Sequence, residues 1–165
     1  MGAPASPAPV GRPSPEGRLV AVNLVACILL LVQYLLGMAV NLYVILPARH
    51  PGAGAGNYFA GGASALRWVI PDGPAWAAAH AAFGLALVLA AFGGVALSRG
   101  SGSRAALAIS VLGALAIVGA GFNGVSFLDY GHALSSMIMA GLWALAMACY
   151  ITGLFLCARR AQPRQ

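Results

Sequence analysis

The chain has 165 residues, of which 61% are hydrophobic and 7% are charged, and its formal net charge is +6. A soluble domain carries roughly 25% charged residues, so a chain this poor in charge indicates lipid rather than water as its solvent. The positive charge does not indicate nucleic acid as a partner. All nine basic residues are arginines at segment ends, and they do not gather beside base-stacking aromatic residues.

Residues 1–18 are rich in Pro, Ala, Ser and Gly and hold nothing apolar enough to form a core, so we expect a disordered tail. Four later segments reach the length of about 20 mostly apolar residues that a membrane-crossing helix needs. These spans cover residues 19–46, 75–97, 105–128 and 134–158. The sequence therefore predicts an all-α fold, with a four-helix membrane bundle over residues 19–158 and a basic tail over residues 159–165.

The arginines orient the four spans. One side of the predicted bundle carries Arg12, Arg18, Arg99, Arg104, Arg159, Arg160 and Arg164. The other side carries only Arg49 and Arg67, in the loop of residues 47–74. Since cytoplasmic loops hold the excess of positive charge, we expect a multi-pass protein of the cell membrane with both termini in the cytoplasm.

The outer loop is too long for a tight connection. Its first part, PARHPGAGAGNYFAGG, is rich in Pro and Gly and is expected to be irregular. The next eight residues, ASALRWVI at 63–70, can form two helical turns. We predict a short interfacial helix that lies over the mouth of the bundle and is ended by Pro71 and Pro74.

Polar side chains recur at one level near the outer ends of the spans. Asn41 and Asn123 each lie five residues before the end of a span, and His80 lies five residues after the start of one. At a rise of about 1.5 Å per residue, all three sit about 8 Å below the outer boundary. The small residues around Asn123, among them Gly121 and Gly124, favour close helix packing and should let its amide reach a neighbouring helix.

Three more polar residues lie at or near that level. Ser136 is near the outer start of the fourth span, Asp129 lies just above the bundle, and Gln33 lies two turns below Asn41. Unpaired polar groups in hydrocarbon cost roughly 2–7 kcal/mol, so the six side chains should face one another. We predict a polar ligand pocket in the outer leaflet. The sequence leaves open that they serve only as interhelical contacts worth about 0.6–2 kcal/mol each.

His80 also suggests a cofactor. Gly84 lies one turn deeper than His80, and a glycine at that spacing would leave room for the porphyrin of a b-type haem. The second axial ligand would have to come from His132, His50, Met38 or Met137. A Soret band in the absorbance spectrum would separate this hypothesis from the others.

Copper is a less favoured second cofactor. His80, Met38 and Met137 would supply imidazole and thioether groups on the outer side, and thioethers suit Cu(I). No catalytic arrangement can be assembled, because the three acids, Glu16, Asp72 and Asp129, form no carboxylate pair.

Several segments together resemble a group of uncharacterised small four-helix integral membrane proteins of high-GC Gram-positive bacteria. They are LLGMAVNLYV (35–44), HPG (50–52), YFAGG (58–62), HAAFGLALVL (80–89), GAGFNGVSFLDYG (119–131) and SSMIMA (135–140). The resemblance implies the fold and the membrane location. The group usually has an acidic residue where His132 stands here, which disfavours His132 as a ligand.

These observations predict a non-enzymatic membrane protein, either an accessory or interaction subunit or a small-ligand binder. The alternative is an electron-transfer protein that binds haem or copper through His80. The expected partners are the lipid bilayer and either another membrane protein or a second copy of the chain.

Overall fold

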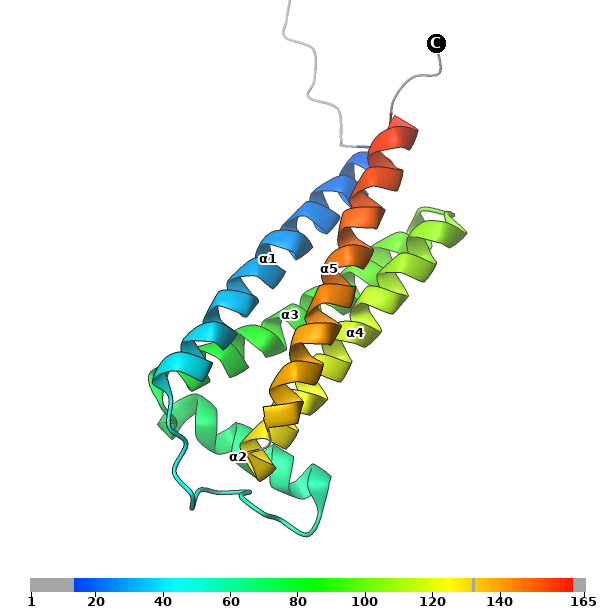
Figure 1. Ribbon diagram of the computed structural model, residues 1–165. Helices are drawn as coiled ribbons and strands as arrows, with labels where there is room; N and C mark the ends of the chain where they lie inside the picture. Colours follow the sequence, from blue (N-terminus) through cyan, green and yellow to red (C-terminus); the bar gives the residue numbers. More distant parts are fainter. Residues whose placement is uncertain (1–13, 132, 162–165) are drawn as a thin grey trace, which may run out of the picture.

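The computed structural model describes residues 14–131 and 133–161, and everything described is helix or connecting loop. Four helices are long and apolar enough to cross a membrane, which confirms the all-α prediction and its four spans. The remaining helix, α2, is shorter and lies at one end of the bundle (Figure 1). In chain order the helices are α1 (Pro15–Tyr43), α2 (Tyr58–Asp72), α3 (Ala75–Gly100), α4 (Arg104–Tyr130) and α5 (Ala133–Ala161).

The four long helices form a closed ring in which each contacts two others. The contacting pairs are α1 with α3, α3 with α4, α4 with α5, and α5 with α1. Within the described residues, no Cα atoms of the diagonal pairs α1–α4 and α3–α5 come within 8 Å of each other. The buried core between the helices includes Leu30, Leu87, Ile117 and Tyr150. This order decides which polar residues can meet.

The start of α1 and the end of α5 lie at the same end of the bundle (Figure 1). Leu19 of α1, Ala106 of α4 and Cys157 of α5 form a small buried cluster there. The helix α2 lies at the opposite end and contacts only α3 and α4 among the long helices.

The boundaries of α1 differ from the predicted span of residues 19–46. The helix begins at Pro15, because the Ser14 side chain accepts a hydrogen bond from Gly17 N (3.1 Å) and proline is favourable in a first turn. The prediction of disorder was therefore wrong for residues 15–18, and residues 1–13 lie outside the described part. The helix ends at Tyr43 because Val44 is already extended (φ −108°, ψ 124°), shortly before Pro47.

The helix α2 is longer than the predicted two turns. It starts at Tyr58, where the Asn57 side chain accepts a hydrogen bond from Ala60 N (3.0 Å), and it passes through Gly61 and Gly62. Pro71 lies inside its last turn, so the helix ends one residue beyond the proline. The expectation that YFAGG is irregular was wrong. Its two glycines are buried in the face that packs on the bundle.

Glycines also bring α4 close to α5. A Cβ added to Gly113 would lie 3.0 Å from the Tyr150 ring, and one added to Gly119 would lie 3.2 Å from Leu142. A Cβ added to Gly124 would lie 3.4 Å from Met139 Sδ. The expectation of close helix packing is confirmed for these three residues. It was wrong for Gly121, since no atom lies within 4 Å of a Cβ added there, and Gly141 of α5 has the same open surroundings.

We predict that Gly62→Ala weakens the attachment of α2 to α4. The added Cβ would lie 2.2 Å from Val125 Cγ1, so one of the helices must move. Overpacking of this kind costs about 1–3 kcal/mol, and thermal unfolding in detergent would measure the loss. Gly56→Ala is the matched control, because a Cβ there meets no atom within 4 Å. Equal stability of the two variants would contradict the packing described for α2.

Candidate functional site

Two of the predicted site residues meet between α1 and α3. Gln33 Nε2 donates a hydrogen bond to the main-chain oxygen of His80 (3.2 Å) and lies 3.3 Å from His80 Nε2. Both helices have the same local pattern, a polar residue followed four positions later by a glycine: Gln33 and Gly37 on α1, His80 and Gly84 on α3. Residues four apart share one face of a helix.

The two glycines receive the two polar side chains reciprocally. A Cβ added to Gly84 would lie 3.1 Å from Gln33 Nε2, and a Cβ added to Gly37 would lie 3.1 Å from His80 Cε1. Each polar group thus fits the space that the glycine of the other helix leaves free. Gln33 Oε1 and His80 Nδ1 remain buried without a hydrogen-bond partner among the described residues.

This arrangement does not fit the haem hypothesis. The space over Gly84 that a porphyrin would need is occupied by the Gln33 amide. Of the proposed second ligands, His50 lies away from His80. His50 stacks on Trp68 in the loop before α2 (ring centroids 4.7 Å apart), and His132 lies outside the described residues.

Met137, one of the proposed copper ligands, is not brought to His80 either. Met137 lies on α5, which does not contact the helix that carries His80, and 72% of its surface is exposed. Met38 is 38% exposed. Within residues 14–131 and 133–161, no three His, Cys, Asp or Glu side chains are grouped closely enough to hold a metal ion.

Asn41 and Ser136 form a second pair, between α1 and α5. The Asn41 amide donates to Ser136 Oγ (3.3 Å), and the hydroxyl can donate back to Asn41 Oδ1 (3.4 Å). Asn123 does not join either pair. Its amide donates to Gly119 O of its own helix (3.0 Å), so the expectation that it reaches a neighbouring helix was wrong. The ring order explains only why Asn123 does not join Asn41, because α4 lies diagonally across from α1.

Asp129 holds the loop between α1 and α2 against the end of α4. It is 5% exposed, its Oδ1 accepts from Ala55 N (3.3 Å), and its main-chain oxygen accepts from Gly54 N (3.1 Å). Its Oδ2 has no hydrogen-bond partner among the described residues and faces Gly61 of α2. The six predicted residues therefore occupy four separate places, and no described contact joins them into one pocket.

Sequence reasoning missed several polar contacts. Tyr58 Oη donates to Phe122 O (2.6 Å) and accepts from Ser126 Oγ (3.1 Å), which fixes the start of α2 on α4. Trp143 Nε1 donates to Leu30 O (2.8 Å) across the α1–α5 seam. Ser98 and Ser110 share a buried hydrogen bond of 2.7 Å across the α3–α4 seam. A buried indole N–H or hydroxyl within a span signals that a partner exists, but not which helix supplies it.

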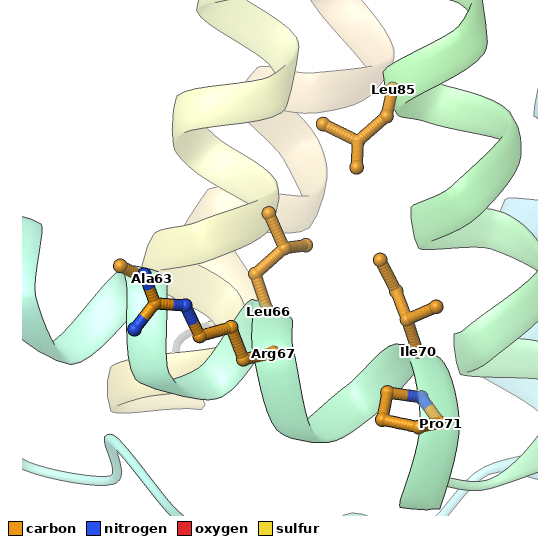
Figure 2. Close-up of a pocket in the computed structure, with 6 residues that line it drawn as sticks. All are labelled: Ala63, Leu66, Arg67, Ile70, Pro71 and Leu85. Carbon is orange, nitrogen blue, oxygen red and sulfur yellow. The ribbon is translucent and has the colours of Figure 1, made fainter.

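The grooves on the surface of the protein lie beside α2 and not among the six predicted site residues. An open groove of about 400 Å³ lies between part of α2 and Leu85 of α3. Figure 2 shows Leu66, Ile70 and Leu85 turned toward it. A second groove of about 140 Å³ continues along α2 toward α4 and is lined by Tyr58, Phe59, Gly62, Ala63, Leu66, Phe122 and Val125. Neither groove is lined by any of the six predicted site residues.

Comparison with known proteins adds no family. No family model matches the chain, and neither the curated proteins nor the solved structures hold a significant match.

We predict that Gly37→Ala destabilises the bundle. The new methyl group would press on the His80 ring at 3.1 Å and push it away from Gln33. Gly141→Ala is the control on another long helix, where a Cβ meets no atom within 4 Å and alanine favours the helix by about 1 kcal/mol. Unfolding in detergent should separate the two variants by about 1 kcal/mol or more. A Gly37→Ala protein as stable as the control would show that the ring does not sit against α1.

Proposed function

We propose that this chain is a non-enzymatic protein of the plasma membrane that binds a small ligand or a membrane partner through α2 and the grooves beside it. Both termini face the cytoplasm in this proposal, and α2 lies in the outer membrane interface. The four long apolar helices support the membrane location. Seven of the nine arginines lie on the side of the termini, which supports the orientation.

One observation carries the proposal: α2 is held firmly on the bundle and still leaves its side open. Gly61, Gly62, Ala65 and Val69 form its buried face. Tyr58 and Asp129 anchor its start and the preceding loop to α4. Phe59 and Ile70 stay 73% and 37% exposed. A rigid amphipathic helix beside an open apolar groove is a preformed binding element, and ligand sites are usually preformed and apolar.

The polar residues of the spans support a structural role rather than a ligand pocket. Gln33, His80, Asn41 and Ser136 bond to one another across helix seams, as interhelical contacts do in membranes. This leaves the grooves beside α2 as the better candidate for a binding function at this end of the molecule.

Cysteine labelling in intact cells tests the sidedness on which the proposal depends. The three native cysteines, Cys27, Cys149 and Cys157, would first be replaced by alanine. Gly56→Cys marks the loop before α2 and Gly100→Cys marks the end of α3; both glycines have open space around them. A membrane-impermeant maleimide should label the first variant in intact cells and the second only after lysis. The reverse pattern would place α2 in the cytoplasm and overturn the proposal.

A further inference from the structure

The grooves beside α2 form one continuous apolar trench. The larger groove is lined by Ala63, Leu66, Arg67, Ile70 and Pro71 of α2 and by Leu85 of α3. The smaller groove shares Ala63 and Leu66 with it and extends to Phe59 and Phe122. Its larger part, about 400 Å³, is within the range of about 300–1,000 Å³ typical of small-ligand sites. Apart from Arg67 and Tyr58, the residues that line it are apolar or small.

Arg67 is the charged exception in this lining. Its side chain runs back along α2, so that the guanidinium group lies beside Ala63 at the rim of the trench (Figure 2). Arg67 is exposed and, within the described part of the chain, makes no hydrogen bond or ion pair. Of the two acids at this end, Asp129 is engaged with the loop backbone, and Asp72 forms no ion pair with Arg67 among the described residues. The Arg67 guanidinium group, beside the apolar trench, is therefore available to bind an anion from outside the protein.

We propose that the trench binds an acyl chain of an anionic phospholipid and that Arg67 binds its phosphate. This inference rests on the proposed function, which places α2 in the outer membrane interface. An anionic phospholipid matches both features. Its flexible hydrocarbon chain fits the apolar lining of the trench, and its negatively charged phosphate fits the Arg67 guanidinium group at the rim. An arginine near such a headgroup contributes attraction, and its long stem lets the charge reach the polar layer. A partner helix would fill the trench only if it also brought its own acid to Arg67.

Lipid binding to the full-length protein in detergent, followed by native mass spectrometry, tests the proposal. The probes are dioleoyl phosphatidylglycerol and dioleoyl phosphatidylcholine. The unchanged protein should bind the anionic lipid about five-fold more tightly, as one arginine near a membrane surface provides. Arg67→Gln should remove that preference. Arg49→Gln, which changes the other arginine of the loop and α2 region and does not line the trench, should keep it.

A second pair of variants tests the trench itself. Ala63→Trp fills the point where the two grooves join and should weaken the binding of both lipids. Ala144→Trp, on the exposed face of α5, should leave both unchanged. These readings remain valid if Arg67→Gln lowers stability, since Ala63→Trp retains the arginine.

Four results would overturn the proposal. Equal lipid preference in Arg67→Gln and Arg49→Gln would reduce the effect to general surface charge. Unchanged binding in Ala63→Trp would show an empty trench, and displacement of the lipid by inorganic phosphate would show a free-anion site. Loss of a dimer in Ala63→Trp would assign the trench to a second copy of this chain. The labelling experiment separates these failures from failure of the proposed function, because it reports only on the side that α2 faces.

Discussion

A polar group inside hydrocarbon has to find its partner within the protein, and this constraint organises the bundle. Gln33 and His80 meet it in part between α1 and α3, because the Gln33 amide nitrogen bonds to His80 while Gln33 Oε1 and His80 Nδ1 keep no partner among the described residues. Each side chain lies against a glycine of the opposite helix. Asn41 with Ser136, and Trp143 with the Leu30 carbonyl, join α1 to α5. A buried serine pair joins α3 to α4. The α4–α5 seam relies instead on Gly113, Gly119 and Gly124, which let the two helices approach closely.

The distribution of these contacts bears on function. Gln33, His80, Asn41 and Ser136 bond between helices, and Asn123 bonds to its own helix, so these residues do not form one chamber beneath the loop that precedes α2. The features left for recognition are outside the ring, where α2 stands on α3 and α4 beside an open apolar trench. The anchors that hold α2 in place, Tyr58 and Asp129, are themselves polar contacts to α4 and the loop backbone. The same physical requirement thus fixes both the bundle and its candidate binding element.

The sequence predicted the spans well because length and apolarity alone decide whether a helix can cross a membrane. Three of the four predicted spans agree with the helices to within three residues at each end. It also placed Gln33, Asn41 and His80 at helix positions where polar partners were needed. It could not assign those partners, because helix order in the ring is a tertiary property. Asn123 lies on α4, which is diagonally across from the helix of Asn41, and its amide bonds to the backbone of its own helix rather than to α3 or α5.

The length of α2 was underestimated for a different reason. Adjacent glycines ordinarily disfavour a helix, so Gly61 and Gly62 in the sequence favour an irregular loop. In the structure their lack of side chains is what permits contact, with Val125 of α4 and with the loop that Asp129 holds. Packing gained at the bundle surface outweighs the weak propensity of the two residues.

A double-mutant cycle between Gln33 and His80 tests the central claim most directly. The free energies of unfolding of Gln33→Ala, His80→Ala and the double variant would be measured in mixed micelles and compared with the unchanged protein. If the two side chains hold α1 to α3, their coupling energy should be about 0.6–1.7 kcal/mol, the range known for such contacts in membranes. A coupling energy of zero, with each substitution costing the same in either background, would contradict the account and return both residues to the search for a ligand.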